Sequence, residues 1–225
     1  MKAFKSIIFI LIVALSVNVN AYASDTVDYA QTLHSLGIIQ GTDKGFEPQK
    51  TLTRAESAAI ITRLLGKENS LSKTGYEENF IDVPKEHWAF EYIMFCYNNS
   101  ITKGTGTDTF SPDTKIDAHQ FVTLLLRLMK YEDISPDGAL DFAVEIQLCN
   151  SKIARSLKQN SEFKRGDMFY LLCRSLKTKM NSGTNFARYL ADEGVITQKQ
   201  ADEFDIYMDF ENIDILIDEL LDGVN

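Results

Sequence analysis

Residues 37–56 carry the pattern Gly37-Ile38-Ile39-Gln40-Gly41, then Phe46-Glu47-Pro48, then Leu52-Thr53-Arg54-Ala55-Glu56. Much of it returns as Ile101-Thr102-Lys103-Gly104, Phe110-Ser111-Pro112 and Ile116-Asp117-Ala118-His119-Gln120. Phe46 and Phe110 are 64 positions apart, as are Pro48 and Pro112. An internal repeat of this length indicates a fold built from successive copies of one supersecondary unit.

A third copy of the pattern is fainter. The stretch Phe163-Lys164-Arg165-Gly166-Asp167 lies 111 positions after Leu52–Glu56, but no Gly…Phe-x-Pro loop precedes it. We therefore expect three repeats followed by a helical extension. The expected boundaries are 24–66 for the first repeat, 79–131 for the second, 138–178 for the degenerate third and 184–225 for the extension.

Each repeat has the pattern of a helix, a loop and a second helix. Thr53 and Glu56 have the spacing of a capping box, in which hydroxyl and carboxylate each satisfy a backbone N–H. Asp117 and Gln120 repeat this spacing, and Lys164 with Asp167 keeps only its acidic half. The helices after these caps are apolar nearly all round, which is typical of buried helices. The sequence predicts an all-α fold, with these three helices as a central bundle, one from each repeat.

The two ends of the chain are predicted to be a leader sequence and a helical extension. Lys2 and Lys5, the apolar run 7–17 and the small residues of Ala21-Tyr22-Ala23 predict a secretory signal peptide over residues 1–23. An uncleaved N-terminal anchor is the alternative, although the run is shorter than the roughly 20 residues of a membrane span. In the extension we expect helices at 186–193, 198–204 and 213–221, the last of them with an acidic face.

Charge and cysteine content narrow the class of protein. The formal net charge is −9 at pH 7, which argues against nucleic acid and against an anionic membrane surface as partners. Three cysteines, Cys96, Cys149 and Cys173, are too few and odd in number for a disulfide framework. We interpret them as small buried hydrophobes, with a Cys149–Cys173 bridge as the alternative.

The repeats resemble the S-layer homology (SLH) family. The likeness rests on Gly-Ile-Ile-x-Gly…Phe-x-Pro…Leu-Thr-Arg-Ala-Glu in the first repeat, and on Phe80-Ile81-Asp82-Val83, His87-Trp88-Ala89 and Tyr92-Ile93 opening the second. It covers residues 27–178. The resemblance implies three repeats in a pseudo-threefold arrangement around the central bundle. It also implies an exported protein, attached to a Gram-positive cell wall by binding an acidic, often pyruvylated, secondary wall polysaccharide between adjacent repeats.

The family's binding positions fall on five residues of this chain. The resemblance assigns glycan binding to Arg54 and Arg165 through the Thr-Arg-Ala-Glu motif, to Trp88, and to the loop glycines Gly41 and Gly104. The chain also departs from the family pattern. Ala118 replaces the arginine of the second repeat, the first repeat lacks the His-Trp-Ala opening, and the third lacks the loop.

Each binding position also has a structural interpretation. A cation in the first turn of a helix opposes the helix dipole, and a carboxylate ligand on Arg54 would relieve this conflict. An internal ion pair with Glu56 or with a neighbouring acid is the alternative. Trp88 can stack on a sugar or pack between repeats, and the two glycines can serve turn geometry alone.

The three histidines lack metal-ligand spacing, and no catalytic motif is present, so we expect neither a cofactor, a metal site nor an enzyme. Two other functions stay open. A module that has lost glycan binding would serve structure or protein interaction at the cell surface, with a partner that the sequence does not identify. An exported hydrolase is the third class.

Overall fold

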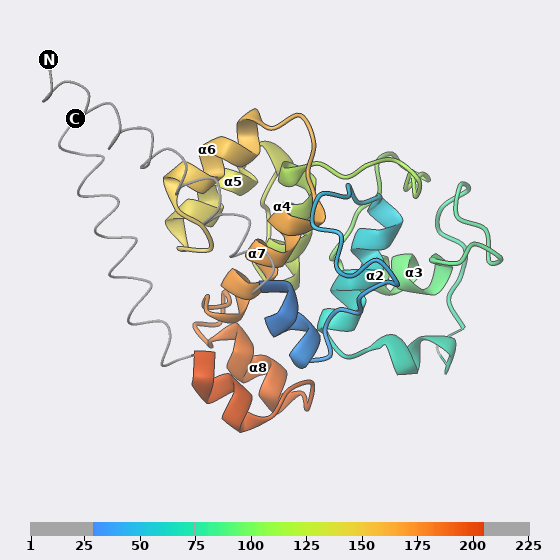
Figure 1. Ribbon diagram of the computed structural model, residues 1–225. Coiled ribbons are helices and arrows are strands. Elements are labelled where there is room, and N and C mark those ends of the chain that lie inside the picture. The colour runs from blue at the N-terminus through green and yellow to red at the C-terminus, as the bar shows by residue number, and fades with distance from the viewer. Residues whose placement is uncertain (1–28, 74, 205–225) are drawn as a thin grey trace, which may run out of the picture.

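A computed structural model describes residues 29–73 and 75–204 of the chain (Figure 1). Within these residues the chain is helical, and its extended pairings are isolated bridges. The helices are α2 (Arg54–Leu64), the 3-10 helix η1 (Glu68–Lys73), α3 (Phe90–Asn98), α4 (Ala118–Leu128), α5 (Pro136–Glu145), α6 (Ser151–Gln159), α7 (Arg165–Leu176) and α8 (Phe186–Asp192), with helical residues also at 29–35 and 198–204. The predicted all-α class is confirmed, and the pseudo-threefold arrangement stays a prediction.

The first two repeats have the expected order of elements. A helix at 29–35 leads through the first loop to α2, and α3 leads through the second loop to α4. The third repeat contains α5 and α7, and in place of the missing Gly…Phe-x-Pro loop it has the additional helix α6, which packs on α5 (Figure 1). The sequence did not predict α6.

The three helix starts are capped differently. In α2, Thr53 Oγ1 accepts the Glu56 N–H at 3.1 Å and the Glu56 carboxylate accepts the Thr53 N–H at 2.8 Å, which confirms the capping box. In α7, Asp167 accepts the N–H of its N-cap residue at 2.9 Å, which is the predicted acidic half. For α4 the prediction of a full box was wrong. Asp117 accepts the Gln120 N–H at 2.8 Å, but the Gln120 side chain bonds to Arg54 instead of returning to the cap.

The helices after the caps are the buried ones, as predicted. In α2 all residues except Glu56 and Arg63 are buried, and α4 and α7 are also buried along most of their length. The helix α4 contacts both α2 and α7, and phenylalanine side chains such as Phe121 and Phe169 fill the space around them. The continuous apolar core therefore joins all three repeats.

Two helix starts dock on the loop of another repeat. The first N–H groups of a helix have no partner within it, and here backbone carbonyls of a Phe-x-Pro loop accept them. The hydrogen bonds run from Arg54 N to Thr114 O (2.9 Å), from Ala55 N to Pro112 O (3.0 Å), from Arg165 N to Lys50 O (2.8 Å) and from Gly166 N to Pro48 O (2.8 Å). The repeated loop thus joins the first repeat to the second and the third to the first.

The start of α4 lacks this kind of junction. Among the described residues, no carbonyl of residues 157–161 accepts the N–H groups of Ala118 or His119. The third repeat has the end of α6 there, and an ion pair between Lys115 and Glu162 (2.8 Å) is the polar contact across the gap. Without a Phe-x-Pro loop, the third repeat as described therefore gives α4 no backbone acceptors of the kind that α2 and α7 have.

Within the second repeat, Asp82 fixes the loop to the segment 80–83 that opens the repeat. Its carboxylate accepts the N–H of Phe110 at 2.9 Å and that of Ser111 at 2.7 Å. Gly104 turns the same loop with φ +84°, and a Cβ there would lie 2.5 Å from Thr109 O. The loop therefore requires glycine at this position for its own geometry.

The C-terminal extension begins as predicted. Its helix α8 packs on α7, and Arg188 of α8 forms an ion pair with Asp202 at 2.6 Å, which ties the helical residues 198–204 to α8. The expected signal peptide over 1–23 and the expected helix at 213–221 lie outside the described residues.

The cysteines give a direct test of the core. Cys96, Cys149 and Cys173 all lie within the described residues, where they are buried and form no disulfide. Burial raises the pKa of Cys96 to about 12, against an opposing effect of the Thr62 hydroxyl, and raises the pKa of Cys149 to about 11.

The burial of these cysteines predicts slow thiol labelling. Because the thiolate is the reactive form, we expect fewer than one thiol per protein molecule to react with a dithiobis-nitrobenzoate reagent at pH 8 in the folded protein. All three should react in denaturant, and rapid labelling without denaturant would contradict the packing described.

Candidate functional site

A groove opens where all three repeats meet. It encloses about 240 Å³ and is lined by the loop 38–42 of the first repeat, one face of α2, Trp88 from the second repeat, and Arg165 with Met168 from α7. We call it the Arg165 groove. Its floor is apolar, formed by Ile38, Ile39, Ala59, Ile60 and Met168, and its rim carries the polar side chains.

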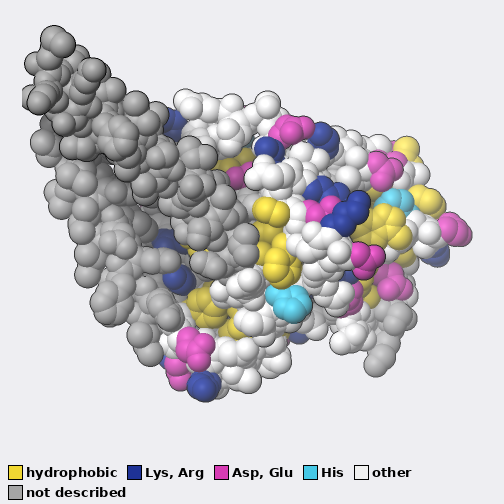
Figure 2. Space-filling view, in the orientation of Figure 1, with side chains coloured by type: hydrophobic (Ala, Val, Ile, Leu, Met, Phe, Trp, Pro, Cys, Tyr) yellow, Lys and Arg dark blue, Asp and Glu magenta, His cyan; other side chains and the backbone are white. Residues whose placement is uncertain are grey.

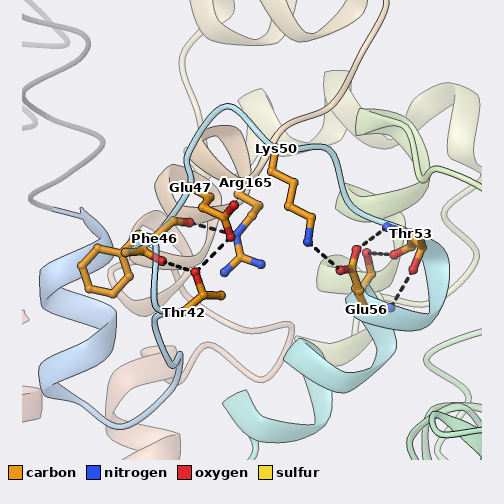
Figure 3. A network of polar contacts seen from close by, with 9 residues as sticks. Thr42, Phe46, Glu47, Lys50, Thr53, Glu56 and Arg165 are labelled. Carbon is orange, nitrogen blue, oxygen red and sulfur yellow. Dashed lines mark hydrogen bonds and ion pairs between the residues drawn. The ribbon is translucent and has the colours of Figure 1, made fainter.

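Arg165 is fixed in this groove through its Nε, and its terminal N–H donors are open. Its Nε donates to Phe46 O at 3.0 Å, and its guanidinium lies 5.7 Å from the Phe169 ring centroid. The side chain is partly exposed, and its two terminal nitrogens form no hydrogen bond or ion pair with the residues that the structure describes. Figure 3 shows the guanidinium between Thr42 on one side and the start of α2 on the other.

Glu56 faces the same groove but is engaged elsewhere. One oxygen accepts the Thr53 N–H at 2.8 Å and the other lies 3.6 Å from Lys50 Nζ (Figure 3). Within the described part of the chain it forms no ion pair with Arg165. The internal pair that could have neutralised the groove's arginine is therefore absent there, because the capping box and Lys50 hold the carboxylate.

Trp88 forms the aromatic wall of the groove. Its side chain is 56% exposed, stacks on His87 with ring centroids 5.9 Å apart, and lies 6.3 Å from the Tyr92 ring. His87 Nδ1 accepts the Ala89 N–H at 3.1 Å and so fixes its own ring at the start of α3. The indole is thus held by its neighbours, with much of its surface open to solvent.

The second cation of the groove is already paired. Arg63 lies 2.9 Å from Glu68 Oε1 through both Nε and Nη2, and its guanidinium lies 5.4 Å from the Tyr92 ring centroid. Burial alone would lower the pKa of Arg63, but Glu68 and Tyr92 outweigh it and the pKa is raised. Glu68 therefore compensates the charge of Arg63, and Arg165 is the groove cation with open donors.

Arg54 lies outside this groove, in the junction between the first two repeats. It is 6% exposed, and its Nε donates to Phe110 O at 2.8 Å while Nη1 donates to Gln120 Oε1 at 2.9 Å. Its guanidinium also lies 4.7 Å from the Phe110 ring centroid. Burial lowers the pKa of Arg54, against opposing effects of Asp117 and Asp82.

Of the five residues predicted from the sequence, the structure brings Trp88 and Arg165 together at one groove. Gly41 lies between two lining residues, Gln40 and Thr42, without a positive φ. Arg54 and Gly104 lie elsewhere. Sequence reasoning missed Gln40, Thr42 and the apolar floor, although the x position of Gly-Ile-Ile-x-Gly already placed Gln40 in the repeated loop.

Other kinds of site receive no support from the described residues. Within 29–73 and 75–204, no group of three or more histidine, cysteine or acidic side chains could hold a metal ion. No helix in that part of the chain has the length and hydropathy needed to cross a membrane. Charged side chains of both signs are interspersed over its visible face (Figure 2).

Comparison with known proteins shows which family and which proteins this chain is similar to. The sequence profile of the S-layer homology domain matches residues 21–58 and 79–117. The chain is similar to a cell surface protein of Thermoanaerobacter kivui, with 30% identity over 162 residues that cover 69% of this chain and 21% of the relative. It is also similar to the middle cell wall protein of Brevibacillus brevis, with 25% identity over 185 residues, 78% of this chain and 17% of the relative.

A third relative is a cellulosome-anchoring protein of Acetivibrio thermocellus, with 29% identity over 85 residues, 38% of this chain and 19% of the relative. The chain therefore spans about a fifth of the length of each of these three relatives.

Proposed function

This chain belongs to the S-layer homology family, and we propose that it binds an acidic secondary cell-wall polysaccharide non-covalently through the Arg165 groove. The family match and the relatives make it a cell-surface module associated with the cell wall. The observation that carries the proposal is the pairing of Arg165, whose terminal donors are open, with the exposed face of Trp88 across an apolar floor.

The groove offers complementary groups for a pyruvylated sugar. A pyruvyl ketal carries a carboxylate and a methyl group on the same carbon. The guanidinium of Arg165 can give a carboxylate two parallel hydrogen bonds, and the floor around Ile60 and Met168 can cover the methyl group. Trp88 can stack on the apolar face of the sugar ring, while Thr42 and Gln40 can bond to its hydroxyls.

We further propose that the chain anchors and does not catalyse. Hydrolysis of a glycosidic bond normally uses two carboxyl groups on either side of the bond. Among the described residues that line the Arg165 groove, Glu56 is the one carboxylate, and both of its oxygens are engaged by Thr53 and Lys50. The groove therefore has the groups for binding and lacks a second acid for hydrolysis.

Trp88 allows a direct test because it is the only tryptophan of the chain. We expect its fluorescence to change saturably when the mature protein is titrated with a methyl hexoside that carries a pyruvyl ketal, because the sugar would cover the exposed indole face. The parent hexoside without the ketal should bind at least about 10-fold more weakly, since it lacks the charge that Arg165 recognises. Equal response to both sugars, or to neither, would contradict the proposal.

A further inference from the structure

We infer that the described residues, 29–73 and 75–204, form a single competent groove, because Gln120 holds the other motif arginine, Arg54, inside the junction between the first two repeats. This inference rests on the proposed function of the Arg165 groove and adds a residue that determines the number of binding sites. Three positions of the repeat correspond, and they hold Arg54, Ala118 and Arg165. Ala118 has no cation, so the question is what distinguishes Arg54 from Arg165.

The two arginines are placed alike up to the last atoms of their side chains. Each donates its Nε to the carbonyl of a loop phenylalanine, Phe110 O at 2.8 Å for Arg54 and Phe46 O at 3.0 Å for Arg165. Each also lies over an aromatic ring. They differ at the terminal nitrogens, because Nη1 of Arg54 donates to Gln120 whereas those of Arg165 meet no acceptor among the described residues.

The two arginines differ in this way because of the third residue of the helix that each one faces, which is α2 for Arg165 and α4 for Arg54. In α2 this residue is Glu56, which completes its capping box and forms an ion pair with Lys50. Glu56 therefore does not pair with Arg165. In α4 it is Gln120, which does not complete the box and whose Oε1 is free to bond to Arg54. Thr114 stands where Lys50 stands in the first repeat, so no cation competes for Gln120.

The surroundings of Arg54 agree with a closed groove. Arg54 is 6% exposed, whereas Arg165 is partly exposed. Trp88 stands two residues before α3, but the residue two before α5 is Ile134, so no tryptophan faces the second position. The start of α5 also approaches α4 closely, with His119 Nδ1 3.0 Å from Pro136 O. The second groove thus lacks both an accessible motif arginine and a tryptophan wall.

The test is the stoichiometry of binding, measured by native mass spectrometry and calorimetry with the pyruvylated methyl hexoside as probe. Wild-type protein should bind one equivalent, and Arg165→Gln should bind none at the same probe concentration. Two equivalents on wild type, with one equivalent remaining on Arg165→Gln, would overturn the single groove and leave the proposed function intact. One equivalent on wild type that Arg165→Gln retains in full would contradict both the single groove and the role of Arg165 in the proposed function. A wild type that binds no probe would contradict the proposed function, and the single groove with it.

A second variant isolates the role of Gln120. Gln120→Ala should keep binding through Arg165 within about twofold of wild type, because Gln120 does not line the Arg165 groove. It should lower the melting temperature, because it removes the acceptor of the Arg54 Nη1 donor. Loss of probe binding in Gln120→Ala with an unchanged melting temperature would show that Arg54 and Gln120 act on the ligand, and would overturn the inference.

Discussion

Replacing Arg165 with glutamine is expected to weaken binding of the pyruvylated hexoside about 10- to 100-fold while leaving the protein folded. Hydrogen bonds to ionised partners contribute about 1.5 to 3 kcal/mol each, and about 1.4 kcal/mol corresponds to a tenfold change in affinity. Glutamine keeps a polar side chain of similar reach but removes the charge and the paired donors. Fluorescence of Trp88 measures the affinity, and thermal unfolding followed by circular dichroism measures stability.

The matched control for this variant is Arg155→Gln. Arg155 is an exposed arginine of α6 that lies outside the groove, so the same change in net charge is made without touching the lining residues. Its affinity should stay within twofold of wild type. If Arg165→Gln and Arg155→Gln bind equally well, the guanidinium of Arg165 does not recognise the ligand.

Replacing Arg54 with alanine is expected to have the opposite profile, a large loss of stability and a small loss of binding. The substitution removes the donors of Phe110 O and Gln120 Oε1 and leaves a cavity beneath the Phe110 ring. Buried polar groups that lose their partner cost about 1 to 3 kcal/mol each, so the free energy of unfolding should fall by about 3 kcal/mol. Urea denaturation of the purified protein measures this change.

Arg155→Ala again provides the control, with an expected change within about 0.5 kcal/mol because exposed substitutions seldom exceed this value. Binding of the probe to Arg54→Ala should be measured well below its melting temperature, where the Arg165 groove is still folded. An Arg54→Ala protein that is as stable as wild type but no longer binds would assign Arg54 to the ligand and contradict its role in the junction.

The sequence predicted best those features that depend on neighbours in the chain. The capping box of Thr53 and Glu56 spans one helical turn, and the structure confirms it. The same spacing in Asp117 and Gln120 forms only half a box, because the Gln120 side chain accepts a hydrogen bond from Arg54, 66 positions away. Contacts between repeats of this kind cannot be deduced from the spacing within one of them.

The arginines illustrate the same limit at the site. Arg54 stands in the more complete copy of the motif, yet the structure buries it, whereas Arg165 of the degenerate copy reaches the groove. The motif specifies an arginine whose Nε bonds to the Phe-x-Pro loop of another repeat, and both residues satisfy that requirement. Whether the terminal nitrogens are open depends on the residue that faces them, Glu56 or Gln120, and therefore on the packing of two repeats.

Co-sedimentation with cell-wall sacculi tests the proposed anchoring most directly. The mature protein should sediment with sacculi that retain their acidic secondary polysaccharide and should stay in the supernatant with sacculi from which that polymer has been extracted, because peptidoglycan alone lacks the pyruvylated sugar. Equal sedimentation with both preparations, or with neither, would contradict binding of the acidic polysaccharide through the Arg165 groove.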